Sequence, residues 1–402
     1  MLLTNNGKVT RNQAKQHNLQ LILRIIYEAR EISRADVART TGLTRTTVSN
    51  AVNELLEEGL VAELGQAPSG GGKPPTLLQV VDTARQVIGV DLGHTILQGA
   101  VFDLRGRVVH HVRRPLGETK SGTAVLDLVY DLITDLINLA DRPLLGIGIG
   151  SPGLMDAQEG IIFQAVNLGW HNLPLRERLE ERFDLPVYLV NDSQAAALAQ
   201  YTFANEEREP GLVVMLAGRG ISAGIILNGQ LYHGTNNTGA SEIGHVRVVE
   251  GGELCTCGHF GCLETVASER AVVRWARKVA ESNPFSSLAQ FANTPEQVTF
   301  ETVLAAFEAH DPAVTPLIHE VGRYLGMAAA NLVGILNLRR IVLAGSLARF
   351  GDGLLEPMTQ EMRQRSLAAL ANKTEVQVSA LQEQVVMLGA AALLLTHELG
   401  VV

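Results

Sequence analysis

The sequence predicts an α/β protein that carries a small helical domain at its N-terminus. The chain has 402 residues, which is long enough for two or three domains. It is 46% hydrophobic, with 39 glycines and only 4% aromatic residues. This composition is typical of buried strands that lead through tight turns into helices. From residue 86 onward such strands recur, whereas residues 17–64 have the apolar periodicity of helices.

Charge is unevenly distributed along the chain. Residues 1–50 carry eight Lys/Arg and three Asp/Glu, a formal charge of +5, which leaves −14 for the rest because the whole chain carries −9. A basic segment on an acidic body predicts that the segment meets a polyanion, although a solvated basic terminus would have the same composition. The start MLLTNNGKVTRNQ has no apolar signal core, and no run of about 18 uncharged apolar residues follows. We therefore expect a cytoplasmic protein without membrane association.

Residues 17–64 contain the signals of a helix-turn-helix. An apolar stripe predicts a first helix, and Ser33 with Asp36 predicts the capped start of the next one. Gly42 stands where a tight turn needs a permissive backbone, and Thr44 can cap a further helix that runs to about Glu58. The apolar stripe of the first helix consists of Leu19, Leu21, Ile22, Ile25 and Ile26.

The helix after Thr44 has the features of a helix that reads the major groove of DNA. Its expected buried face carries Val48, Val52, Leu55 and Leu56. Short hydrogen-bonding side chains and one arginine occupy the other face, which is what base-edge contacts require. These expected DNA-contacting residues are Arg45, Thr46, Thr47, Ser49, Asn50 and Asn53.

The segment GLVAELGQAPSGGGKPPTLLQV predicts two short strands around a Gly/Pro loop, the wing of a winged helix. Lys73 at its tip could contact a phosphate or the minor groove. Residues 1–80 are thus predicted to form a winged helix-turn-helix DNA-binding domain with its linker. A helical protein-interaction module with a polar face is the alternative, but it leaves the wing and the basic charge unexplained.

Residues 85–402 predict a second, larger domain. Gln86–Val109 alternates as a β-hairpin, and buried strands follow in LLGIGIGSPGLMD and LPVYLVNDSQAAALAQ. GLVVMLAGRGISAGIILNGQLYHG predicts another hairpin, and AAANLVGILNLRRIVLAGSLA predicts a helix followed by a strand. This order is similar to the two-lobed actin/hexokinase-like (ribonuclease H-like) fold, in which two α/β lobes enclose a sugar and a nucleotide.

The succession of motifs resembles the ROK (repressor, open reading frame, kinase) family over nearly the whole chain. These motifs are the winged helix, the Asp-x-Gly loop at Asp91, the Asn-Asp helix start at Asn191 and the pattern His-x9-Cys-x-Cys-x4-Cys. The N-terminal domain makes the resemblance strongest to NagC/XylR-type transcriptional regulators. Residues 85–402 would then be a ROK sugar-binding domain.

All three cysteines lie within GHVRVVEGGELCTCGHFGCLE, Gly244–Glu264. The resemblance implies a structural zinc site around residues 245–262 with one imidazole and three thiolates, from His245, Cys255, Cys257 and Cys262. Four such ligands leave no open position for a catalytic water. His259 is a rival ligand, but the family spacing selects His245. A buried cluster of reduced thiols is the alternative.

The resemblance also implies a monosaccharide pocket. In sugar-binding members of the family, two carboxylates and the zinc-bound histidine line this pocket, and carboxylates accept hydrogen bonds from sugar hydroxyls. The matching positions here are Gly153, Asn167, Asn191, Asp192, Glu242, His245 and Glu264. Glucose, N-acetylglucosamine, xylose and other monosaccharides fit these residues equally.

The nucleotide loops depart from the pattern of family kinases. His94 stands where the first phosphate loop has its second glycine, Arg219 and Ser222 replace a hydroxyl residue and a glycine in the second loop, and the adenosine-side turn is Ala344–Ser346. Because a kinase must cradle ATP phosphates with backbone amides, we expect no ATP cofactor and no catalytic residues. If the chain were a kinase, Asp192 would be its catalytic base and Asp91 would lie near the metal.

We therefore expect a sugar-responsive transcriptional regulator, a repressor that binds operator DNA and is released or modulated by a monosaccharide. A ROK sugar kinase with a fused DNA-binding domain is the alternative. A third possibility is an adaptor that binds neither DNA nor sugar, but it leaves both the DNA-binding and the sugar-binding motifs unexplained. Operators of such proteins are usually palindromic and are bound by two DNA-binding domains, which predicts a homodimer, or a tetramer.

Overall fold

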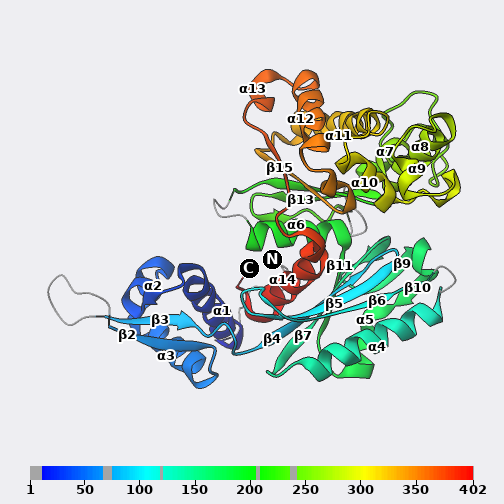
Figure 1. Cartoon of the computed structure of the whole chain (residues 1–402). Coiled ribbons are helices and arrows are strands. Elements are labelled where there is room, and N and C mark those ends of the chain that lie inside the picture. The colour runs from blue at the N-terminus through cyan, green and yellow to red at the C-terminus, as the bar shows by residue number, and fades with distance from the viewer. Residues whose placement is uncertain (1–10, 67–74, 118–120, 205–208, 236–241, 402) are drawn as a thin grey trace.

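The computed structural model describes residues 11–66, 75–117, 121–204, 209–235 and 242–401. Figure 1 shows a small N-terminal domain beside a body of two lobes, each built around a five-stranded sheet. Lys73 lies outside the described residues. No helix in the described ranges is long and apolar enough to cross a lipid bilayer.

The N-terminal domain is a winged helix. Its elements are α1 (Arg11–Ala29), β1 (Ile32–Ser33), α2 (Arg34–Thr41), α3 (Arg45–Glu57), β2 (Val61–Gln66) and β3 (Thr76–Val80). The three strands form an antiparallel sheet in the order β1-β3-β2, with β2 and β3 as the wing.

The local signals in this domain are confirmed. The Ser33 side chain accepts a hydrogen bond from the Asp36 amide, and Thr44 accepts one from the Thr47 amide. Gly42 ends α2 in the left-handed conformation, at φ 70°. The stripe of α1 needs one correction: Leu23 is buried, whereas Leu21 and Ile25 are only partly buried.

The lower lobe has β4, β5 and β6 as an antiparallel meander, continued by β7 and β11 in parallel, in the order β11-β7-β4-β5-β6. A smaller sheet, β10-β9-β8, extends it. The elements are β4 (Gln86–Leu92), β5 (Ile96–Asp103), β6 (Val108–Pro115), α4 (Thr123–Leu139), β7 (Leu144–Ser151), β8 (Leu154–Asp156), β9 (Ile161–Ala165), η1 (Val166–Leu168), β10 (Trp170–Pro174), α5 (Leu175–Phe183) and β11 (Val187–Asn191).

The upper lobe has a sheet in the order β14-β13-β12-β15-β16, covered by a layer of helices (Figure 1). Its elements are β12 (Leu212–Ala217), β13 (Ile221–Leu227), β14 (Gln230–Leu231), η3 (Ile243–His245), α7 (Leu263–Ala267), α8 (Glu269–Ser282), α9 (Leu288–Phe291), η4 (Pro295–Gln297), α10 (Phe300–Glu308), α11 (Thr315–Leu336), β15 (Arg340–Ala344), η5 (Ser346–Phe350), α12 (Asp352–Arg365), α13 (Ala368–Ala371), β16 (Glu375–Val378) and η6 (Gln382–Gln384).

Two helices, α6 (Asp192–Phe203) and α14 (Val385–Leu399), form a layer between the two sheets (Figure 1). α6 packs on β12 and β13, α14 packs on β4 and β7, and the two helices pack on each other. α14 is apolar on nearly all sides, as a helix enclosed by protein must be. The layer is very close-packed: a Cβ added to Gly389 would lie 1.7 Å from the Ala195 carbonyl oxygen, and one added to Gly224 would lie 2.0 Å from the Ser193 oxygen.

The N-terminal domain contacts the body through Arg105, in the turn between β5 and β6. Its guanidinium lies 3.9 Å from the centre of the Tyr27 ring, donates to the Tyr27 carbonyl at 2.8 Å and pairs with Asp82 at 2.9 Å. The Tyr27 hydroxyl donates to the Leu104 carbonyl at 2.9 Å. A second contact lies at the end of α14, where Gly400 meets Gln20 of α1.

Candidate functional site

The outer face of α3 is available to a DNA groove. Arg45, Thr46 and Asn50 are exposed, and the buried side of the helix, at Val48 and Val52, packs into the domain core. The other predicted contacts are less free: Ser49 is half-buried, and Thr47 is half-buried and holds the helix cap with Thr44. The exposed residues lie toward the N-terminal half of the helix, which is where helix-turn-helix proteins contact bases.

Asn53 is already engaged by the protein. Its Oδ1 accepts a hydrogen bond of 2.9 Å from Arg34 at the start of α2, and Arg34 also pairs with Glu63 on β2 at 3.1 Å. This bridge fixes α2, α3 and the wing relative to one another. Sequence reasoning missed Arg34, because nothing in the local pattern shows which exposed arginine reaches a neighbouring helix.

The predicted zinc ligands converge on one point. The ligand atoms of His245, Cys255, Cys257 and Cys262 all lie within 4.8 Å of one another. Cys255 Sγ is 3.5 Å from His245 Nδ1, and Cys257 Sγ is 3.6 Å from Cys262 Sγ. A tetrahedral zinc ion with Zn–S bonds of about 2.3 Å separates its sulfur ligands by about 3.8 Å, so this donor set fits zinc in both chemistry and spacing.

The loop around these residues is shaped by its own backbone. The Cys255 amide donates to the His259 carbonyl at 2.8 Å, and the Gly258 amide donates back to the Cys255 carbonyl at 2.9 Å. Gly261 packs so tightly that an added Cβ would lie 1.7 Å from the Val249 oxygen. His259 Nδ1 lies 3.6 Å from Cys257 Sγ, beside the four-residue group but not part of it.

Three of the predicted sugar-binding positions meet where α6 begins. Asn191 caps α6: its Oδ1 accepts from the Ser193 amide and hydroxyl, at 3.0 and 2.7 Å, and its Nδ2 donates to the Gly153 carbonyl at 3.3 Å. Gly153 has φ 92° and lies against β9, where a Cβ would be 2.1 Å from the Gln164 oxygen. Asp192 follows as the first residue of α6.

The carboxylates form an electrostatically coupled group. Part of the Asp192 side chain is accessible, but the protein around it desolvates the carboxylate and raises its pKa to about 7, with the charges of Asp91 and Glu242 adding to the effect. Desolvation likewise raises the pKa of Glu242, which His245 lowers and Glu264 raises. Glu264 Oε2 accepts from the Ile221 amide at 3.3 Å. Acidic groups with perturbed pKa values that lie close together are typical of binding sites.

Asn167, in η1, carries a side-chain amide nitrogen that is buried and has no hydrogen-bond partner among the residues that the structure describes. A buried donor of this kind is costly unless a ligand or water accepts from it. Asn167 follows β9, the strand on which Gly153 packs.

Two of the loops that depart from the kinase pattern lie close together, since a Cβ added to Gly218, beside Arg219, would lie 3.4 Å from Ser346 Oγ. Burial, together with the charges of Arg219 and Arg270, lowers the pKa of His94 to about 4. Asp91 accepts from Gln98 Nε2 at 3.0 Å, and burial raises its pKa to about 6. Ser346 Oγ donates to Glu269 at 2.9 Å.

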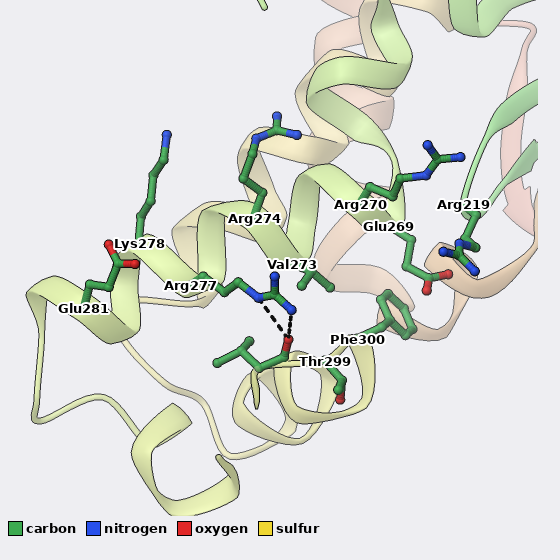
Figure 2. Close-up of a pocket in the computed structure, with 11 residues that line it drawn as sticks. Arg219, Glu269, Arg270, Val273, Arg274, Arg277, Lys278, Glu281, Thr299 and Phe300 are labelled. Carbon is green, nitrogen blue, oxygen red and sulfur yellow. Dashed lines mark hydrogen bonds between the residues drawn. The ribbon is translucent and has the colours of Figure 1, made fainter. Parts of the chain in front are cut away.

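A pocket of about 660 Å³ opens between α8, the β12–β13 turn and the start of α10 (Figure 2). Sequence reasoning missed it, although the spacing of Arg270, Arg274 and Arg277 in ERAVVRWARK was a visible signal for one basic helix face. Its charged lining residues are Arg219, Glu269, Arg270, Arg274, Arg277, Lys278 and Glu281.

Comparison with known proteins agrees with this architecture. Residues 87–397 match the ROK family, and residues 21–70 match the MarR family. The chain is 33% identical to the xylose repressor of Caldicellulosiruptor bescii, over 96% of this chain and 97% of that protein. It is 32% identical to a glucokinase of Halalkalibacterium halodurans, over 78% of this chain and 96% of the glucokinase.

Among solved structures, a ROK family transcriptional regulator described as a homologue of the E. coli MLC protein superposes with a TM-score of 0.84 and 26% identity, covering 96% of this chain and 98% of that one. The match extends through both the winged helix and the two lobes. The chain is therefore a member of the ROK family with an N-terminal MarR-type winged helix.

Proposed function

We propose that this protein is a sugar-responsive transcriptional repressor. One observation carries the proposal: a winged helix with an exposed reading helix and a two-lobed body with a cluster of desolvated carboxylates occur in one chain and touch each other. The relatives that span nearly all of this chain include proteins named xylose repressors. Residues 1–80 would bind operator DNA, and residues 85–402 would bind the effector.

In the N-terminal domain, Arg45, Thr46 and Asn50 would contact base edges, with Ser49 and Thr47 supporting them and Lys73 holding a phosphate. The bidentate amide of Asn50 suits adenine, and the Arg45 guanidinium suits guanine or a phosphate. The engagement of Asn53 with Arg34 gives it a smaller role in base contact than its position in the sequence suggests.

In the body, a monosaccharide would bind between Gly153, Asn167 and Asn191 on one side and Glu242, His245 and Glu264 on the other. Asp192 follows Asn191 and senses the charge of Glu242, and its carboxylate would accept a hydrogen bond from a hydroxyl group of the ligand. The buried amide of Asn167, which finds no partner in the described part of the chain, supports this arrangement because a sugar hydroxyl would accept from it.

A zinc ion bound by His245, Cys255, Cys257 and Cys262 would stabilise this wall of the pocket. Glu242 and Glu264 flank the ligand segment in the chain, one on each side, so the ion would hold both carboxylates in place. Elemental analysis should find one zinc per chain in protein purified without chelator. A Cys257→Ser variant should lose both thermal stability and sugar affinity, and zinc-free protein with unchanged sugar affinity would refute this role.

The signal would pass through the helix layer. A sugar that draws Asn191 and Asp192 toward Glu242 moves α6, and α6 packs on α14, whose end meets α1 of the DNA-binding domain. Two half-sites about one helical turn apart tolerate little displacement of paired readers, so a small shift in a homodimer or tetramer would weaken operator binding. Coupling of this kind is commonly about 1–3 kcal/mol, which predicts graded release.

A sugar kinase is the second candidate, favoured by the similarity to a glucokinase. We infer that ATP is not a cofactor, because His94 and Arg219 replace small residues at two positions where family kinases approach phosphates. In a kinase Asp192 would act as base. An ATP-consumption assay with hexoses and pentoses separates the two functions, and turnover with any sugar would establish the kinase.

The deciding experiment is operator titration with and without sugar. A thermal-shift screen of monosaccharides, including xylose, glucose and N-acetylglucosamine, first identifies the sugar that stabilises the protein most. That sugar should weaken operator binding by wild type about 5- to 100-fold. The Asp192→Asn variant should bind operator normally and respond weakly, and unchanged wild-type affinity with sugar would defeat the proposal.

A further inference from the structure

Arg34 joins three elements of the DNA-binding domain. It is the first residue of α2, and its guanidinium reaches both the reading helix α3 and the wing. One nitrogen, Nη1, donates to Asn53 Oδ1 on α3 at 2.9 Å and to the Ser49 carbonyl at 3.4 Å. The other, Nη2, pairs with Glu63 Oε1 on β2 at 3.1 Å. The position of this one side chain is therefore coupled to the two surfaces that would meet DNA.

Asn53 lies on the reading face of α3 but is held by the protein. It is exposed and follows Asn50 by three residues and Ser49 by four, which places it one turn further along the same face. Because an arginine donates and never accepts, the Asn53 atom that meets Arg34 is the amide oxygen. A bidentate contact with adenine needs this oxygen and the amide nitrogen together. The amide would have to turn away from Arg34 to make that contact.

Glu63 gives the guanidinium its second anchor, at the base of the wing. The pairing of β2 with β3 shifts register between Glu63 and Gly65, and Gly65 has φ 107°. Such a bulge bends a strand, so the direction of the wing is set at this point. A free carboxylate here would also repel DNA phosphates. Arg34 neutralises Glu63 and fixes the base of the wing against the reading helix.

A second ion pair on α3 provides a contrast. Lys15 of α1 pairs with Glu54 at 2.8 Å, and this pair engages none of the predicted DNA-contacting residues. The Lys15 side chain is 63% exposed, whereas that of Arg34 is 29% exposed and has three acceptors. An ammonium is a point charge, but the planar guanidinium fixes the direction of each partner. The Lys15 pair can only stabilise the fold, while Arg34 also decides where a side chain of the reading face points.

We propose that Arg34 is a positioning residue that sets operator specificity by withholding Asn53 from the bases. Base reading is thereby confined to the N-terminal part of α3, which carries Arg45, Thr46 and Asn50. This rests on the proposed function and specifies how the operator is read. Without the guanidinium, the Asn53 amide turns toward the groove and reads one more base pair in each half-site. An amide side chain suits adenine, so the gained preference is for adenine.

The test compares charge-neutral variants of the full-length protein in the absence of sugar. Each variant binds a library of duplex DNA with a randomised central segment, and sequencing of the bound fraction gives the base preference at every position. Arg34→Met/Glu63→Gln should gain a preference of about fivefold or more for adenine at one base pair of each half-site. Adding Asn53→Ala should abolish this gain. A merely structural role of Arg34 would lower affinity without creating a preference that depends on Asn53.

Lys15→Met/Glu54→Gln is the matched control, because it removes the other ion pair of α3 without a change in net charge and should select the same sequences as wild type. If the Arg34→Met variant does not fold, Arg34→Lys gives the same comparison, since an ammonium has no planar fork to span Asn53 and Glu63.

Three results would each overturn the proposal: an unchanged preference in the Arg34 variants, a gained preference that survives Asn53→Ala, or an equal gain in the Lys15 control. In all three cases sequence selection by wild type would still support the repressor. If wild type itself selected no sequence, the DNA-binding function would be refuted, and this proposal with it.

Discussion

Two contacts connect the parts of this molecule, and they are built on different principles. Between the lobes, α6 and α14 meet backbone to backbone, with Gly389 against the Ala195 carbonyl and no side chain between them. Between the N-terminal domain and the body, the guanidinium of Arg105 joins Tyr27 and Asp82, beside the packing of Gly400 on Gln20 of α1. The first contact is steric, and the second depends largely on one polar side chain.

The difference shows where flexibility can lie. A layer packed at backbone distance has no tolerance for added volume, so its helices must move as a unit. The interactions of Arg105, one cation–π contact, one ion pair and a few hydrogen bonds, can be lost at a cost of a few kcal/mol. We therefore expect the lobes to move α14 as a rigid element and the N-terminal domain to be the part that changes its position.

The largest effect is expected from breaking the layer with Gly389→Ala. The new Cβ would lie 1.7 Å from a backbone oxygen, which must move, and we expect a loss of about 3 kcal/mol in the free energy of unfolding. The control is Gly334→Ala in α11, where nothing lies within 4 Å of the new Cβ and a gain of about 0.5–1 kcal/mol is expected. Urea denaturation measures both, and equal stability of the two variants would show that α6 and α14 separate freely.

The protonation of Asp192, the first residue of α6, gives a second test of the packing of the α6–α14 layer. The pKa of Asp192 is about 7 in the folded protein, well above its usual value, because the protein around it, with Asp91 and Glu242 nearby, disfavours the charge. The folded state therefore binds this proton more tightly than the unfolded state does. The resulting contribution to the free energy of unfolding is fully present at low pH and is lost as the pH rises from about 4 to 7. Asparagine cannot ionise, so the melting temperature of Asp192→Asn minus that of wild type should be about 2–4 °C larger at pH 8 than at pH 5.

Differential scanning calorimetry at the two pH values gives this comparison. Asp127→Asn, at an exposed position on α4, removes the same charge and should show no such change between pH 5 and pH 8. A pH-independent difference for Asp192→Asn would mean that the carboxylate is solvated and does not sense the layer.

The polar contact is broken by Arg105→Ala. Loss of the ion pair, of the hydrogen bond to Tyr27 and of the stacking on its ring should cost about 1–2 kcal/mol in stability. The sugar-dependent change in operator affinity should shrink by more than half, because the domain is less firmly held to the body. Arg107→Ala removes a largely exposed arginine that also pairs with Asp82 but is not held to Tyr27, and should keep the response. A full response in Arg105→Ala would place the coupling elsewhere.

The smallest effect is expected from Tyr27→Phe. This change removes only the hydroxyl that donates to the Leu104 carbonyl and keeps the ring beneath Arg105. We expect a loss of about 1 kcal/mol or less and an unchanged operator response. If Tyr27→Phe were as damaging as Arg105→Ala, the hydrogen bond rather than the guanidinium would be the main link, which operator titration and thermal melting together would reveal.

The sequence by itself determined the features that depend on neighbouring residues. The ends of α2 and α3 are set locally. Ser33 and Thr44 each cap a helix by accepting from an amide three residues away, and Gly42 ends α2 because glycine adopts the left-handed conformation easily. The spacing of the cysteines identified the four-residue cluster through its family resemblance, and the order of strands and helices indicated two lobes.

The tertiary structure alone decided the contacts between distant segments. Arg105 and Tyr27 are 78 residues apart, and Arg34 reaches Asn53 across two helices. The basic pocket likewise joins the β12–β13 turn to α8. Periodicity and capping encode which face of an element is buried, but not which element covers it, because that choice depends on the shape and charge of surfaces that exist only once the chain has folded.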